Sequence, residues 1–164
     1  MRVLCCLDGT NVEQVSKAIT MLWATQPLTL GILYVTDAGP RHDIGHLRER
    51  FLRSPGPPGP REHEMQQAEH AAAQDVLNEG RHRLPNAETL QRQGRPEREI
   101  VNVAAEWQAD LVVLCPRAEY EGKPTIGPKS VGHVARFVLD HAPCPCCCYG
   151  RLHETNFLST GNPA

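Results

Sequence analysis

The chain has 164 residues and a formal net charge of −2. This length suits a single domain with its own core, and the near-neutral charge gives no strong field for nucleic acid. No run of about eighteen apolar residues is present, and Asp8 ends the apolar start of the chain. We therefore expect a soluble, cytoplasmic protein that does not enter a membrane.

The first part of the chain alternates strand-like and helix-like segments. Residues 2–7 are almost all apolar, which is typical of a parallel strand covered on both faces. Thr10 and Glu13 have the spacing of a capping box, and an amphipathic helix is predicted from there to about Thr25. Residues 28–35 form a second apolar strand. This pattern predicts a β-α-β unit.

The middle of the chain is more polar. Residues 41–53 have a weak helical pattern, and the proline and glycine residues of 54–60 predict a mobile insertion within the domain. A long helix is predicted from about 61 to 83 and ends near Gly80 or Pro85. Its apolar face would contain Met65, Ala68, Ala72, Val76 and Leu77.

The next two strands differ in polarity. Residues 87–93 are polar for a buried strand and are predicted to form an edge strand. Pro96 opens a helix with an apolar face, and residues 111–115 are the clearest buried strand of the chain.

The last helix and strand follow a long loop of residues 116–131. Ser130 is predicted to cap the helix, whose apolar side contains Val134, Phe137, Val138 and His141. Cys146 to Tyr149 is strand-like, and residues 150–164 are predicted to be a disordered tail. Five strands alternating with four main helices predict an α/β fold: one domain over residues 1–149 with an open, five-stranded parallel sheet and helices on both faces.

Ligands of such sheets bind beyond the carboxyl ends of the strands, where the strand order reverses. Asp8 and Cys115 occupy two of these ends, and Gly132 opens the last helix. The N–H groups of a helix N-terminus favour anions. We therefore expect Asp8 to bind a polar group and the Gly132 turn to bind phosphate.

Five landmarks of the chain, in this order, resemble the universal stress protein family. They are Val3 to Thr10 ending in Asp-Gly-Thr, Gly94-Arg95-Pro96, residues 109–114, Gly132 to Ala135, and His141 to Pro145. The resemblance spans residues 2–149. It implies a Rossmann-like sheet of strand order 3-2-1-4-5, pairing of two copies through the last strand and, as in many members, ATP binding.

The chain departs from the nucleotide motif of that family, which is Gly-x-x-Gly, nine residues, then Gly followed by Ser or Thr. Cys115-Pro116-Arg117-Ala118 stands where the first two glycines belong, or else Gly122 takes the second position and Glu119 the first. His133 replaces the hydroxyl residue. Because a Cβ or a proline ring restricts the approach of backbone N–H groups to phosphate, we expect modest affinity for ATP or AMP.

The candidate ligand-binding residues combine these two lines of reasoning. Some match family positions that contact adenine, ribose or phosphate, and others could add positive charge. The set is Asp8, Gly9, Thr10, Val35, Cys115, Arg117, Lys129, Gly132, His133 and Val134.

Two functions are compatible with this sequence. One is a stress-response sensor that binds an adenine nucleotide weakly. The other is a dimeric interaction module that has kept the fold and lost ATP binding. No motif joins a nucleophile, a base and an orienting acid, so we expect no dedicated enzyme, although slow ATP hydrolysis is compatible with the sequence.

The seven cysteines suggest core packing rather than a metal site or disulfides. Strand side chains alternate, so Cys146 and Cys148 would face one side and Cys147 the other, and Cys5 and Cys6 would likewise separate. We expect no metal. Because the last strand would lie at the edge of the sheet, Cys146 to Tyr149 is predicted to form a homodimer interface.

Overall fold

A computed structural model describes residues 1–23, 27–37, 60–115 and 132–149. The elements are β1 (Arg2–Leu7), α1 (Val12–Trp23), β2 (Thr29–Asp37), α3 (Pro60–Arg83), β3 (Glu88–Gly94), α4 (Pro96–Glu106), β4 (Leu111–Leu114), α5 (His133–His141) and β5 (Cys146–Cys148). The predictions for residues 41–53 and 150–164, and for most of the insertion at 54–60, lie outside the described residues. Pro60 itself is the first residue of α3.

The five strands form one parallel sheet in the order β3-β2-β1-β4-β5, which confirms the predicted fold and strand order. Strand β1 is central, and Val3 pairs with Leu30 on one side and with Leu111 on the other. Val3, Leu4 and Cys5 are 0% exposed. This burial on both faces explains why residues 2–7 are almost continuously apolar.

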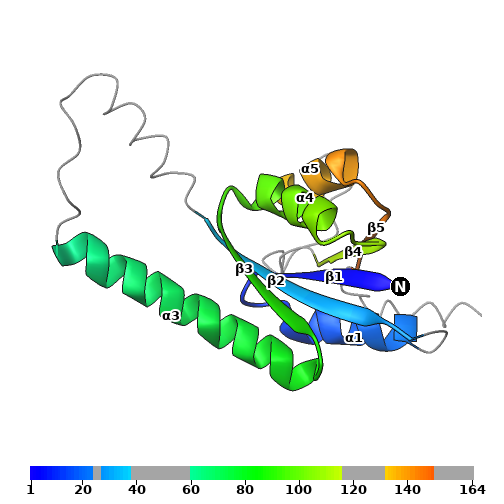
Figure 1. Ribbon diagram of the computed structural model, residues 1–164, viewed down its shortest axis with the longest axis horizontal. Helices are drawn as coiled ribbons and strands as arrows, with labels where there is room; N and C mark the ends of the chain where they lie inside the picture. Colours follow the sequence, from blue (N-terminus) through cyan, green and yellow to red (C-terminus); the bar gives the residue numbers. More distant parts are fainter. Residues whose placement is uncertain (24–26, 38–59, 116–131, 150–164) are drawn as a thin grey trace, which may run out of the picture.

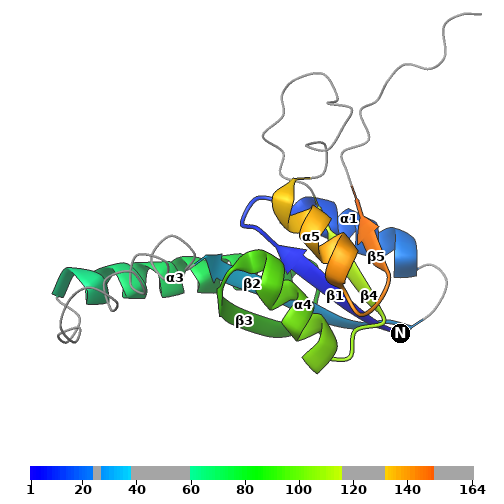
Figure 2. The same cartoon turned by 90° about the horizontal axis from the view of Figure 1, so that it is seen from above.

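Helices cover both faces of the sheet (Figures 1 and 2). Helices α1 and α3 pack on one face, and α4 and α5 pack on the other. The cysteine side chains alternate between these two layers as predicted: Cys5 and Cys147 pack with α1 and α3, whereas Cys6 and Cys146 pack with α4 and α5. None of the helices in the described ranges is both long enough and apolar enough to cross a membrane.

The predicted apolar face of α3 is wrong in its first half. Met65 is 46% exposed, and Ala68 and Ala72 are exposed too. Figure 1 shows that the start of α3 projects past the end of the sheet, so no strand of the described sheet lies beside the first turns of the helix. Ala72 is exposed for another reason: its neighbour Ala73 is buried, so Ala72 is on the outer side of the helix. The buried positions are Ala73, Leu77 and Gly80.

Gly80 lies inside α3 and does not end it. A Cβ on Gly80 would lie 2.9 Å from Leu7 Cδ1 and 3.0 Å from Ile32 Cδ1. The glycine therefore permits close contact between α3 and the sheet. The helix ends at Arg83, just before Pro85, as the alternative end predicted.

Two predicted helix starts also need correction. The first helical hydrogen bond of α1 runs from Val15 N to Asn11 O (3.0 Å), so Asn11 and not Thr10 is the N-cap. The Thr10 hydroxyl instead donates to Asp8 Oδ1 (3.0 Å). The N-cap of α5 is Gly132, whereas Ser130, the predicted cap, lies outside the described residues.

Candidate functional site

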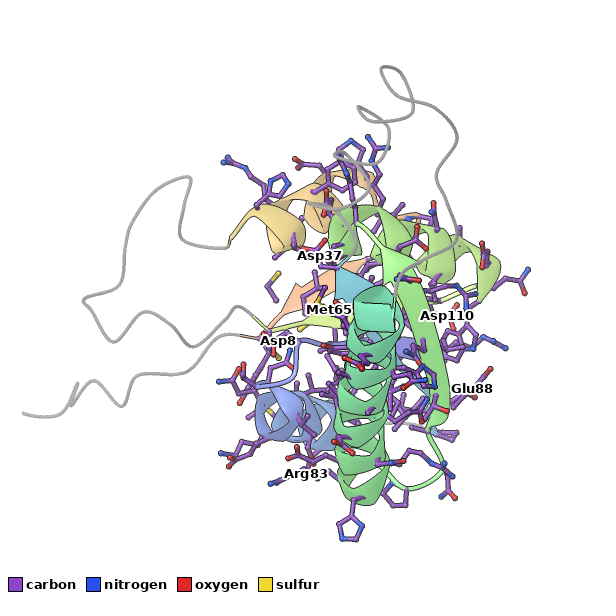
Figure 3. All side chains as sticks on the ribbon, turned by 90° about the vertical axis from the view of Figure 1, so that its left-hand side faces the viewer. Asp8, Asp37, Met65, Arg83, Glu88 and Asp110 are labelled. Atoms are coloured by element: carbon purple, nitrogen blue, oxygen red, sulfur yellow. The ribbon has the colours of Figure 1, made fainter. Side chains whose placement is uncertain are left out.

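A cavity of about 430 Å³ lies at the carboxyl end of the central strands. Parallel strands place their carboxyl ends, and the N-termini of the helices that follow them, at one edge of the sheet. Figure 3 looks onto this edge and labels Asp8, which follows β1, and Asp37, the last residue of β2. The cavity is lined by Cys6, Leu7, Asp8, Asn11, Leu33, Tyr34, Val35, Asp37, Pro96, Ile100, Leu114, Cys115, Gly132, His133, Val134 and Ala135.

Six of the predicted ligand-binding residues line this cavity together. They come from four separate parts of the chain: Asp8, Val35, Cys115, Gly132, His133 and Val134. The expected convergence of the β1 end, β2 and the α5 N-terminus is therefore present in the fold.

Of the predicted residues that the structure describes, Gly9 and Thr10 are not among the lining residues. Gly9 has a φ of +91°, and a Cβ there would lie 3.7 Å from Val76 on α3, which is on the opposite face of the sheet from α4 and α5. Thr10 is exposed, and both its N–H and its hydroxyl bind Asp8. Arg117 and Lys129 lie outside the described residues.

Several lining residues were not predicted from the sequence. Asp37 was missed because β2 extends two residues beyond the predicted end at Val35. Asn11 was missed because the start of the helix was assigned to Thr10 and Glu13, and no role was assigned to Asn11. Pro96 and Ile100 bring the first turn of α4 to the cavity, and their helix was predicted, but its contribution to a ligand site was not.

The Asp8 carboxylate is held by its own turn. Its Oδ1 accepts hydrogen bonds from Thr10 N (2.8 Å) and from the Thr10 hydroxyl (3.0 Å). Asn11, which is 3% exposed, fixes the backbone: its Oδ1 accepts from Asp8 N (3.1 Å), and its Nδ2 donates to Cys6 O (3.0 Å). Within the described residues, Oδ2 of Asp8 forms no hydrogen bond. One carboxylate oxygen is thus available for a ligand hydroxyl or amine.

The N-terminus of α5 offers the opposite chemistry. The first helical bond runs from Arg136 N to Gly132 O (3.1 Å), so the N–H groups of His133, Val134 and Ala135 have no acceptor in the described part of the chain. Gly132 has φ 80° and ψ 160°, and a Cβ on it would meet nothing within 4 Å. This cap leaves three N–H groups beside the cavity, where an anion would be stabilised.

The other helix end at the cavity differs in charge. The first turn of α4 contains Glu97 and Glu99, whose carboxylates complement its positive end. The first turn of α5 contains no acidic residue. The two helix ends meet where His133 Nε2 lies 3.9 Å from Glu97 Oε1. Of the two, α5 has the end that is left for an anionic ligand.

The thiols at the cavity are protonated at neutral pH. Burial, and then the nearby Asp8 carboxylate, raise the pKa of Cys115 to about 12. Burial also raises the pKa of Cys6 well above its usual range. These thiols act as apolar lining and not as nucleophiles. Among the described residues, no three His, Cys, Asp or Glu side chains are placed to hold a metal ion.

Comparison with known proteins identifies the family. A sequence model of the universal stress protein family matches residues 1–149. The universal stress protein UspA from Lactobacillus plantarum has 24% identity and a TM-score of 0.62, over 91% of this chain and 97% of that chain. A universal stress protein family protein from Arabidopsis thaliana with AMP bound has 16% identity and a TM-score of 0.55, over 92% of each chain.

A universal stress protein in complex with cAMP has 16% identity and a TM-score of 0.50, over 90% of this chain and 94% of that chain. No curated protein sequence matches significantly. At these identities the structural likeness shows a shared fold. Because the family model covers all but the last residues of the sequence, and the strand order agrees, the chain belongs to the universal stress protein family.

Proposed function

We propose that the chain binds an adenine nucleotide in this cavity and acts as a nucleotide sensor in a stress response. The observation that carries the proposal is that three features surround one cavity of about 430 Å³. They are the hydrogen-bonded carboxylate of Asp8, an apolar wall, and the N-terminus of α5, which has no acidic residue in its first turn. This volume suits a small-molecule site. The two family structures with AMP and with cAMP support the ligand class.

The chemistry of the walls orients the nucleotide. The base and ribose lie against Val35, and a ribose hydroxyl donates to the open oxygen of Asp8. The phosphate accepts hydrogen bonds from the N–H groups at the start of α5. Affinity for ATP is modest, because Cys115 and Ala118 stand where glycines would let the backbone approach a polyphosphate, and Pro116 between them restricts the backbone further.

A cavity-filling variant tests the proposal. Val35→Phe adds an aromatic ring at a half-buried lining position and is expected to abolish binding of AMP and ATP in calorimetric titrations. Leu139→Phe introduces the same side chain on α5 at a position that is 45% exposed and is not among the lining residues, so it should bind like the parent protein. Heat of AMP binding that is equal in the parent protein and in Val35→Phe would place the nucleotide elsewhere.

Within this proposal the site binds a nucleotide and does not act as a dedicated catalyst of its hydrolysis. Cys115 lines the cavity, but its pKa is raised to about 12, so the thiol is not ionised near pH 7 and is a poor nucleophile. Slow hydrolysis of bound ATP is compatible with the proposal. Phosphate release at a rate typical of enzymes, lost in Asp8→Asn, would instead establish an ATPase.

The cysteines support the proposal of a cytoplasmic location. All seven are free thiols, and six of them pack in or against the two hydrophobic layers as small apolar side chains: Cys5, Cys6, Cys115, Cys144, Cys146 and Cys147. Reducing conditions preserve such thiols, so we place the protein in the cytoplasm. Recovery of the native protein in a secreted fraction would contradict this.

A dimeric interaction module is the second candidate function, and the outer edge of β5, which pairs with no strand in the described ranges, favours it. Pro145 O accepts from Val112 N (3.0 Å), and Tyr149 N donates to Leu114 O (2.8 Å). Because backbone groups alternate along a strand, Cys146 and Cys148 direct their N–H and C=O groups away from β4. Figure 2 shows β5 at the outer edge of the sheet. A second copy could pair with these groups and form a homodimer.

Proline substitutions in β5 can test dimer formation separately from folding. Cys148→Pro removes an N–H group that β4 does not use, so the variant should fold and be monomeric, whereas the parent protein sediments as a dimer under reducing conditions. Cys147→Pro removes an N–H group on the β4 side and should lower stability. A monomeric parent protein at high micromolar concentration would exclude this interface.

A further inference from the structure

We propose that His133 determines which adenine derivative the cavity prefers, by pairing its imidazolium with a ligand phosphate. Phosphorylated adenosine would then bind more tightly as pH falls, and adenosine would not. This inference rests on the proposed nucleotide function and adds to it a specificity residue and a pH dependence.

The position of His133 supports this role. It is the first residue of α5, lines the cavity, and has a side chain that is 79% exposed. Its own N–H group is one of the three without an acceptor in the described part of the chain. A phosphate bound by that helix end would therefore lie within reach of the imidazole ring.

The charges around the cavity make His133 distinctive. Among the described lining residues there is no lysine or arginine, and Asp8 and Asp37 are carboxylates. His133 is thus the one described lining side chain that can become positive. An imidazole ring is either neutral or positively charged, so the charge that this position offers to a phosphate depends on protonation of the ring.

Other charged groups face His133 from neighbouring elements. Glu97 on α4 is only 14% exposed and has Oε1 3.9 Å from His133 Nε2. Asp8 and Asp37 face the same cavity from the ends of β1 and β2, Cys115 contributes a protonated thiol from the end of β4, and Arg136 follows on α5. In the bound state the phosphate joins Glu97 as a second anionic partner for the ring.

The sign of the pH effect follows from proton linkage. A phosphate favours the imidazolium over the neutral ring, so binding is coupled to proton uptake wherever free His133 is neutral. Affinity for a phosphate-bearing ligand should therefore rise as pH falls and level off once the free ring is protonated. Between about pH 8 and pH 6 we expect about a tenfold gain, the effect of roughly one charge-assisted hydrogen bond.

The test compares cAMP with adenosine across pH. The phosphodiester of cAMP keeps one negative charge over this range, whereas a phosphomonoester loses charge near pH 6 and would confuse the result. Calorimetric titrations of the full chain with each ligand should show the tenfold gain for cAMP, with proton uptake seen in buffers of different ionisation heat. Adenosine affinity should stay constant.

Three variants locate the effect. His133→Asn should bind cAMP at all pH values as the parent protein does at high pH, and His133→Arg should bind it tightly with no pH dependence. His141→Asn removes an exposed histidine at the far end of α5 that is not among the lining residues, and should keep the parent pH profile. Circular dichroism checks that each variant remains folded at the lowest pH.

The outcomes separate this inference from the proposed function. Suppose that cAMP and adenosine both bind. If the affinity for cAMP does not change with pH, or if its pH dependence persists in His133→Asn, the role of His133 is refuted and the nucleotide site stands. If neither ligand binds at any pH, the proposed function and the inference both fail.

Discussion

Replacing Gly132 with alanine should weaken the binding of a phosphate-bearing ligand while leaving the protein folded. Gly132 combines φ 80° with ψ 160°, a region that is essentially restricted to glycine and costs other residues about 1–3 kcal/mol. A Cβ there would meet nothing within 4 Å, so the cost is backbone strain and not a steric clash. The strain is relieved if the cap rotates, and rotation moves the N–H groups of His133 and Val134.

The binding loss can be estimated from those N–H groups. A hydrogen bond to a charged group contributes about 1.5–3 kcal/mol, and about 1.4 kcal/mol is tenfold in affinity. Misplacing the equivalent of one such bond should weaken AMP binding by roughly 10- to 150-fold. Adenosine, which has no phosphate, should lose less than about threefold, since about 0.6 kcal/mol is the most that a shift of the apolar contacts should cost.

Calorimetric titration with AMP and adenosine measures this difference, and urea unfolding measures the cost to stability. Ile19→Val on α1 is a matched control: the side chain is 1% exposed, is not among the lining residues, and should lose about 0.5–1.5 kcal/mol of stability with no change in binding. A folded Gly132→Ala protein with parental AMP affinity would show that phosphate does not bind at α5. Equal losses for AMP and adenosine would show that the cavity itself had collapsed.

Three further predictions concern stability. Asn11 is 3% exposed and its amide donates to Cys6 O at 3.0 Å. Asn11→Ala removes this amide, so urea unfolding should show that the unfolding free energy falls by about 2–4 kcal/mol. A fall below about 0.5 kcal/mol would contradict the buried hydrogen-bond network. Gly31→Ala places a Cβ 3.0 Å from Trp107 Cζ2, so it should lose about 1–3 kcal/mol and alter indole fluorescence, and an unchanged unfolding curve would refute the tight packing. Burial raises the pKa of Cys115 from 9.0 to about 12, so the native thiol keeps a proton that the unfolded chain loses. The unfolding free energy should fall as pH rises from about 9 to about 12 in reducing buffer, and Cys115→Ala should make that fall shallower; identical slopes would contradict the shift.

The sheet could be predicted from the sequence because strands that are buried on both faces are apolar at nearly every position. Residues 2–7 and 111–115 are apolar without alternation, as strands covered on both faces require. The edge position of β3 could likewise be predicted from its polar residues. The carboxyl ends of these strands then placed Asp8 and Cys115 at the cavity.

The failed predictions depend on tertiary contacts. The periodicity of α3 does not reveal where the sheet ends, so the exposure of Met65 could not be predicted from it. Gly80 looked like a helix end because its close contact with β1 and β2 is not local in sequence. Asp37 was missed because the length of β2 depends on pairing with β3, which continues to Gly94.

The central claim is that an adenine nucleotide binds at the carboxyl end of β1 and β2, and amide spectra of isotope-labelled protein titrated with AMP test it most directly. We predict saturable shifts concentrated at the amides of Val35, His133 and Val134. The opposite end of the sheet, where Glu88 and Asp110 lie, should remain unchanged. No saturable shift, or shifts centred on Glu88 and Asp110, would contradict the account.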